Sequence, residues 1–151
     1  MGIKGIWYNE LGSMMNITTV NDKDGTISGN YQTAVGNDAK IPTYSLIGMV
    51  NKSDVNHPNG QAIGWTVFWP DVYSHPHTSA VTTWSGQYKL DIDGHEEIIT
   101  FWLLTTETPS SDDWEATKIG QDTFTRDQPT NQDIGLARQR RTFSHPKKIE
   151  Q

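Results

Sequence analysis

Large aromatic side chains and small polar side chains share the same strand faces in this sequence, a combination that suits the binding of a compact ligand. Residues two positions apart in a β-strand point to the same side of the sheet. Aromatic rings on that side cover apolar ligand surface, and amide, hydroxyl or carboxylate groups beside them hydrogen-bond to its polar atoms. The groups that share one face are Trp7, Asn9 and Leu11; Ile27, Gly29 and Tyr31; Trp65, Val67 and Trp69; Thr82, Trp84, Gly86 and Tyr88; and Trp102, Leu104 and Thr106.

A core built only for stability would have a different composition. Leu, Ile and Val fill an interior without polar atoms, whereas a buried tryptophan needs a partner for its N–H. An ordinary aromatic core accounts for any one of the six tryptophans, but less well for several of them beside Asn, Ser, Tyr, Thr and Asp. The pattern therefore predicts the lining of a barrel that holds a small ligand, with a plain aromatic core as the alternative.

The elements that position these side chains are expected to be short strands. Turn residues such as Asp24-Gly25, Pro58-Asn59-Gly60 and Asp93-Gly94 separate β-rich runs, a spacing typical of an antiparallel sandwich or barrel. Together with the ligand-type lining, about eight strands predict an all-β fold: an eight-stranded antiparallel up-and-down β-barrel with a ligand cavity at one end. The expected strands cover residues 5–11, 13–20, 25–33, 43–51, 61–70, 79–91, 95–106 and 116–126.

Length and charge limit the domain organisation and the partners. The 151 residues suit one domain, predicted as a barrel over 1–127 followed by a tail over 128–151 with a short helix around Asn131–Arg140 and an otherwise loose, disordered course. The tail holds five Lys and Arg against two acids, so with a net charge of −6 the rest of the chain carries −9. An acidic body repels phosphates, and no apolar run approaches the ~20 residues of a membrane helix. We therefore expect no nucleic-acid or membrane partner; the absence of cysteine also excludes disulfides and thiolate metal sites.

The opposite strand faces carry apolar residues as well. Phe68, Ile99, Phe101, Leu103 and Ile119 fall on the outward positions of their strands. A monomeric barrel favours polar residues there, because large exposed apolar patches mark interaction surfaces. The outer pattern therefore predicts subunits that pack back to back.

Five sequence blocks resemble the avidin/streptavidin family and follow one another in order from about residue 5 to residue 127. They are similar above all to its cysteine-free streptavidin and fungal tamavidin-like members. The resemblance implies an eight-stranded barrel, a homotetramer, and high-affinity biotin binding without turnover, so neither an enzyme nor a cofactor is expected. The blocks are Gly5-Ile-Trp-Tyr-Asn-Glu-Leu-Gly-Ser13, Gly64-Trp-Thr-Val-Phe-Trp69, Thr82-Thr-Trp-Ser-Gly-Gln-Tyr88, Trp102-Leu-Leu-Thr105 and Gly120-Gln-Asp-Thr-Phe-Thr125.

The same resemblance implies roles for the polar residues. Asn9, Ser13 and Tyr31 match the three donors to the ureido carbonyl of biotin. Asp122 and Thr33 match the acceptors for the two ureido N–H groups. Preorganised groups of this kind strengthen one another in a dry pocket.

Apolar walls and a lid complete the implied site. Thr82 matches the hydroxyl that faces the thioether sulfur, and Trp114 matches the tryptophan that each subunit lends to a neighbour's site. Burial of ligand surface against indole rings contributes about 25 cal/mol per Å². The wall and lid residues implied by the resemblance are Leu11, Val35, Gly36, Asn37, Trp69, Trp84, Trp102 and Leu104.

Two regions depart from the family pattern. Ala80 stands where the family has a serine that binds the ligand carboxylate, and Ser79 or Thr78 could replace it only if the strand bulged. His75 and His77 are two residues apart, but the proline between them and the missing third ligand favour solvated loop histidines over a metal site.

Two other functions compete with biotin binding. A lipocalin-like carrier of another small hydrophobic ligand would share the barrel, but a greasy ligand would leave the polar lining unpaired at about 1–3 kcal/mol per group. A hydrolase acting through barrel carboxylates is disfavoured, because Asp122 is the only acid on the predicted inward faces and glycosidases use two. The compartment stays open between the cytoplasm and secretion after removal of a leader.

Overall fold

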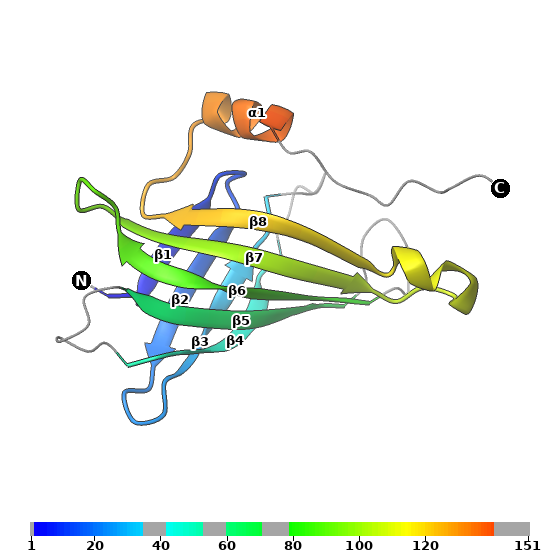
Figure 1. The fold of residues 1–151 in the computed structure, drawn as a ribbon, viewed down its shortest axis with the longest axis horizontal. Coiled ribbons are helices and arrows are strands. Elements are labelled where there is room, and N and C mark those ends of the chain that lie inside the picture. Colours follow the sequence, from blue (N-terminus) through cyan, green and yellow to red (C-terminus); the bar gives the residue numbers. More distant parts are fainter. Residues whose placement is uncertain (1, 35–41, 53–59, 71–78, 141–151) are drawn as a thin grey trace.

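A computed structural model describes residues 2–34, 42–52, 60–70 and 79–140. Eight antiparallel strands form one closed barrel in which each strand pairs with the next along the chain and the last pairs with the first (Figure 1). The predicted eight-stranded up-and-down barrel is thereby confirmed. The strands are β1 (Gly5–Asn9), β2 (Met14–Val20), β3 (Thr26–Gln32), β4 (Tyr44–Val50), β5 (Gln61–Trp69), β6 (Ala80–Leu90), β7 (Glu96–Thr106) and β8 (Thr117–Thr125).

Strand lengths differ around the barrel, and the shortest strand closes it. β6 and β7 pair over eleven residues each, whereas β1 has five residues and meets β8 only through Tyr8–Thr125 and Asn9–Phe124. β1 ends at Asn9, two residues before the predicted end, because the chain turns there and Gly12 adopts a φ of +85°. A positive φ is readily available to glycine alone among common residues.

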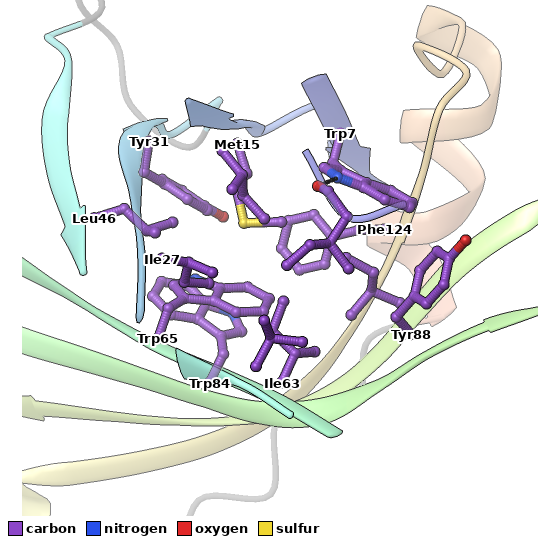
Figure 2. Close-up of a cluster of buried hydrophobic side chains, with 14 of the residues drawn as sticks. Trp7, Met15, Ile27, Tyr31, Leu46, Ile63, Trp65, Trp84, Tyr88 and Phe124 are labelled. Atoms are coloured by element: carbon purple, nitrogen blue, oxygen red, sulfur yellow. Dashed lines mark hydrogen bonds between the residues drawn. The ribbon is translucent and has the colours of Figure 1, made fainter. Parts of the chain in front are cut away.

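The barrel interior is filled largely by aromatic and aliphatic residues, among them Trp7, Ile27 and Trp65, which sequence parity placed inward. Trp7, Met15, Ile27 and Phe124 are fully buried, and Trp65 is 2% exposed. Figure 2 shows the Tyr31 ring on one wall and the neighbouring indoles of Trp65 and Trp84 on another, with the Tyr31 hydroxyl pointing into the interior. The interior therefore combines a packed apolar cluster with inward polar groups.

The outer surface of β5 to β8 is apolar, as the sequence predicts. Phe68, Phe101, Leu103 and Ile119 are 54%, 60%, 51% and 59% exposed, and Ile99 is half-buried. Phe68 of β5 is paired with the exposed Val81 of β6, and Leu103 of β7 is paired with Ile119 of β8, so the exposed apolar residues continue from strand to strand. These side chains form one outward face across the longest strands.

Among the described residues, two helices accompany the barrel. The 3₁₀ helix η1 (Ser110–Glu115) lies between β7 and β8, where only a turn was predicted, and α1 (Asn131–Arg140) forms at the residues where a short helix was expected. α1 lies outside the barrel wall (Figure 1). No helix in the described part of the chain has the length and apolar character needed to cross a membrane.

A polar network ties the chain's first residues to the end of β8. The guanidinium of Arg126 donates to Glu96 Oε2 at 3.0 Å and to the carbonyls of Gly2 and Ile6, and its Cζ lies 3.5 Å from the ring centre of Trp7. The Gly2 N–H and the Tyr88 hydroxyl both donate to Glu96 Oε1. We call this set of residues (Gly2, Trp7, Tyr88, Glu96 and Arg126) the basal network.

The neighbours of Tyr88 and Glu96 in the basal network shift the pKa values of both groups. Burial and the hydrogen bond to Glu96 raise the pKa of Tyr88 to about 12. Burial tends to raise the pKa of Glu96, but the hydrogen bonds from Arg126 and Tyr88 outweigh it and hold that pKa below its ordinary value. The network therefore keeps a carboxylate ionised although its side chain is only 14% exposed.

Candidate ligand-binding site

The turn after β1 presents the side chain of Asn9 from a fixed position. Asn9 is 4% exposed, and its Oδ1 accepts hydrogen bonds from the backbone N–H groups of Leu11 at 3.1 Å and Ser13 at 2.8 Å. The Gly12 N–H donates to the Asn9 carbonyl, and the Asn9 N–H donates to the Ser13 carbonyl. Because the turn uses the amide oxygen twice, the Asn9 NH₂ group points away from these donors and can donate elsewhere.

Ser13 connects this turn to the residues after β3. Its hydroxyl oxygen is 3.1 Å from the Ala34 N–H, from which it accepts a hydrogen bond, and the residue is only 2% exposed. A hydroxyl has one proton and two acceptor positions, so this bond leaves the proton of Ser13 to be donated. Thr33, directly before Ala34, is half-buried.

Asp122 is a buried carboxylate on β8 with a tryptophan partner. It is 3% exposed, and its Oδ2 accepts a hydrogen bond from Trp84 Nε1 at 2.9 Å. The Thr100 hydroxyl donates to the Asp122 backbone carbonyl at 2.9 Å. Burying a charge is costly unless it is hydrogen-bonded, so the indole N–H offsets part of the cost of placing this acid inside the barrel.

Thr82 and Trp69 form a second indole–oxygen pair. Trp69 Nε1 donates to Thr82 Oγ1 at 2.8 Å, and the two residues lie on neighbouring strands, offset by two pairs in the register. Tyr44 packs edge-on against Trp69 with ring centres 4.7 Å apart, and Tyr31 does so at 5.7 Å. Trp69 is thereby held in place although it is only half-buried.

Aromatic stacking links these polar groups into one cluster. The Tyr31 ring lies 5.1 Å from Trp84, and Trp84 stacks on Trp65 with ring centres 5.6 Å apart. Phe124 packs edge-on against both Tyr31 and Trp65. The hydrogen bond to Asp122, the stacking on Trp65 and the contact with the tilted Tyr31 ring therefore fix Trp84, as preorganisation of a binding wall requires.

The structure brings most of the predicted site residues to the barrel interior and leaves others apart. Leu11 is buried, Trp102 and Leu104 are half-buried, and Ala80 faces inward at 4% exposure. Trp114 in η1 is 46% exposed and stands apart from the buried set. Val35, Gly36 and Asn37 lie outside the described residues, as do His75 and His77.

Sequence reasoning missed three residues that shape the interior. Tyr44 could have been found by its register position opposite Tyr31. Gly120 belongs to one of the motif blocks, and its role is to make room: a side chain there would collide with the indole of Trp102. Glu10 accepts a hydrogen bond from the Thr123 N–H at 3.0 Å, a pairing that no spacing rule indicates.

Two other features of the described residues were considered as sites. Ligand atoms of Asp91, Asp93 and His95 lie within 4.8 Å of one another, but Asp91 Oδ1 already accepts from the Asp93 and His95 N–H groups, which accounts for the cluster as a turn. A hollow of about 450 Å³ is bordered by Asp24, Gly25 and residues of β4, β5 and β6. None of its lining residues is a predicted site residue.

Comparison with known proteins gives a consistent result. The family model described as "Avidin family" matches residues 1–127. The chain belongs to the avidin family. Two proteins of Gallus gallus, Avidin-related protein 4/5 and Avidin, are each 35% identical to this avidin-family chain over 126 residues, which is 82% of the chain and 77% of each relative. The match ends before α1, so that helix lies beyond the part shared with the family model.

Proposed function

We propose that this protein binds biotin in the barrel interior without transforming it. Membership of the avidin family supports this function. The observation that carries it is the turn at Asn9, where two backbone donors hold the amide oxygen at 3.1 and 2.8 Å and so direct the NH₂ group elsewhere. Together with the Ser13 hydroxyl, that group is suited to a strong acceptor such as a ureido carbonyl.

The remaining polar groups suit the other side of a cyclic urea. In the proposal, Asp122 and Thr33 accept from the two ureido N–H groups, Tyr31 adds a third donor to the carbonyl, and Thr82 faces the sulfur. The indoles of Trp69 and Trp84, each fixed by its own N–H bond, cover the rings and the chain. Leu11, Trp102 and Leu104 extend this apolar wall, and Val35, Gly36 and Asn37 serve as its lid.

Binding without turnover makes sequestration of the vitamin the biological role that we infer. A carrier of a wholly apolar ligand is disfavoured, because such a ligand would bury the Asn9 N–H groups and the Ser13 proton against hydrocarbon at about 1–3 kcal/mol each. Ala80 offers only a methyl group at the position where the family places a carboxylate-binding serine. We infer that selectivity for the carboxylate of the ligand is weak.

Isothermal titration with biotin, beside a fatty acid of similar length, tests the function. We expect one biotin per chain with a favourable enthalpy and a change in tryptophan fluorescence, and no binding of the fatty acid. Binding of the fatty acid in preference to biotin would instead identify a lipocalin-like carrier. The absence of any heat with biotin would refute the proposal.

A homotetramer in which Trp114 completes a neighbour's site is the second part of the proposal. η1 holds Trp114 with 46% of its surface exposed, an unusual state for an indole. The outward face formed by Phe68, Phe101, Leu103 and Ile119 supplies a surface for back-to-back packing. Both features would be explained if copies of the chain covered them.

Trp114→Ala should weaken biotin binding by about 2 kcal/mol or more, the scale of a hot-spot tryptophan, and should destabilise the assembly. Titration calorimetry and sedimentation velocity measure the two effects. Ile92→Ala is the matched control, because Ile92 is fully exposed in the β6–β7 turn, far along the chain from η1. Unchanged affinity and an unchanged sedimentation profile for Trp114→Ala would contradict the shared site.

A further inference from the structure

The helix α1, which lies beyond the residues shared with the family model, touches the turn that carries the site's donors. Ile134 and Ala137 are partly buried, and the other residues of α1 are exposed. A methyl group added at Gly12 would lie 3.0 Å from Ile134 Cδ1 and 3.7 Å from Ala34 Cβ. Ile134 therefore sits directly over Gly12, next to Ala34.

Gly12 and Ala34 flank the hydrogen bonds that hold the site. Gly12 lies between Leu11 and Ser13, whose N–H groups both donate to Asn9 Oδ1. The Ala34 N–H donates to the hydroxyl of Ser13 at 3.1 Å. The side chain of Ile134 thus covers the contact between the β1–β2 turn and Ala34.

The position of α1 depends on this contact and on one cap. Thr130 and Asp133 form a reciprocal cap: Thr130 N and Oγ1 donate to Asp133 Oδ2, and the Asp133 N–H donates to Thr130 Oγ1. The hydrogen bond from the Thr130 hydroxyl lowers the pKa of Asp133, so the cap is ionised at neutral pH. A ten-residue helix is marginal in water on its own, so its packing on Gly12 contributes to its existence.

We propose that α1 is a clamp on the β1–β2 turn, in which Ile134 acts as a positioning residue through Gly12 and Ala34. By holding the turn closed, Ile134 keeps the Asn9 NH₂ group and the Ser13 hydroxyl in their binding geometry and slows release of the ligand. This inference rests on the proposed function for its effect on biotin, but the clamp on the turn exists without ligand.

Dissociation and association rates of biotin test the clamp. Ile134→Ala should release biotin about fivefold faster, since networks that act through packed neighbours change coupling by amounts of this order and affinity changes appear mainly in the off-rate. The association rate should stay unchanged, and Ile134→Leu should restore slow release. Leu136→Ala is the matched control, because Leu136 is an apolar residue of the same helix that is 44% exposed. Equal dissociation rates for Ile134→Ala and wild type would overturn the proposal.

Amide hydrogen exchange of the ligand-free protein tests the clamp proposal independently of the proposed biotin binding. The Ser13 and Ala34 amides should exchange faster in Ile134→Ala than in Leu136→Ala, while the amides of β6 and β7 stay unchanged. A protein that shows this difference but fails to bind biotin refutes the proposed function and supports the clamp of the turn. A protein that binds biotin, with neither the exchange nor the dissociation altered, refutes the clamp alone. A lowered melting temperature of Ile134→Ala without faster release marks a purely structural contact and also overturns the proposal.

Discussion

Buried and partly buried polar side chains gather in two regions of the barrel, and the two regions differ in which hydrogen-bonding groups are already used within the chain. In the basal network, Glu96 accepts from Gly2, Tyr88 and Arg126, and Arg126 also reaches two backbone carbonyls and the Trp7 ring. In the candidate site, the bonds on Asn9 and Ser13 occupy acceptor positions. In the basal network the Glu96 carboxylate is paired with the Arg126 guanidinium of the same chain. In the candidate site the Asn9 NH₂ group and the Ser13 hydroxyl proton remain able to donate to a ligand.

The difference separates stability from binding. An ionic network in which every group is hydrogen-bonded rigidifies its surroundings. Removing one partner destabilises the folded protein, because the remaining charge is left unpaired with little access to water. The side chains of Asn9 and Ser13 are already ordered by hydrogen bonds from backbone N–H groups before a ligand binds. Ligand binding therefore does not have to supply the conformational entropy of ordering them. Substitutions in the basal network should therefore change stability and leave binding alone, and substitutions in the site should do the reverse.

Arg126→Met should give the largest loss of stability. It leaves the Glu96 carboxylate, only 14% exposed, without its cation, and it removes the packing on Trp7. We expect the free energy of unfolding to fall by about 2 kcal/mol, between the values for an exposed and for a fully buried ion pair, because the pair is partly buried. Thermal and denaturant unfolding at one protein concentration measure the loss, and the affinity for biotin should not change.

A double-mutant cycle sharpens this prediction. Glu96→Leu combined with Arg126→Met removes both charges, so no buried carboxylate is left unpaired. The double variant should be more stable than Arg126→Met alone, because the two effects are coupled through direct contact. Simple addition of the two single effects would mean that the pair contributes no ionic interaction.

Asp122→Asn should weaken ligand binding and leave the stability of the protein nearly unchanged, the opposite of the effect expected for Arg126→Met. Replacing an ionised acceptor by a neutral amide should weaken biotin binding by about 1.5–3 kcal/mol, the scale of a hydrogen bond to a charged group. The amide oxygen can still accept from Trp84 Nε1, so the melting temperature of the ligand-free protein should change little. Titration calorimetry checks the affinity, and unaltered binding would remove Asp122 from the site.

The sequence predicted the barrel and its inward faces because period-two alternation is a local property. Trp65 and Trp84, on adjacent strands, were assigned to the interior by parity alone, and both are buried. Parity also placed Phe101 and Leu103 outward, as the structure has them. Fold class and facing were therefore predictable without a structure.

What the sequence could not predict depends on contacts between distant residues. The pairing of Arg126 with Glu96 spans 30 positions, and the contact of Ile134 with Gly12 joins the tail to the first turn. Such contacts depend on how the barrel closes and on where α1 packs against the β1–β2 turn. The resemblance suggested Asn9 as a donor, but only the structure shows that its oxygen is occupied by the turn.

Alkaline pH provides a milder test of the basal network. Because the pKa of Tyr88 is raised to about 12 in the folded protein, the unfolded chain ionises its tyrosine first, near its ordinary value of about 10. The stabilisation is fully present below about pH 10 and is lost as the pH rises towards about 12. Tyr88→Phe should flatten the fall of melting temperature over this range, whereas Tyr8→Phe, outside the network, should not. Parallel curves for wild type and Tyr88→Phe would contradict the assignment.

Glu10→Ala should give the smallest effect, at the border between the two regions. Glu10 Oε2 accepts from the Thr123 N–H at 3.0 Å, just past the last β1–β8 pair, and Thr123 follows Asp122. Loss of this one partly buried bond should weaken biotin binding by about 0.5 kcal/mol, the low end for a hydrogen bond. Glu10→Gln keeps an acceptor and should behave as wild type in titration calorimetry. If Glu10→Ala lowered the melting temperature without changing affinity, the contact between Glu10 and Thr123 would contribute to stability, as the basal network does. The residues that determine binding would then include Asp122 but not its neighbour Thr123.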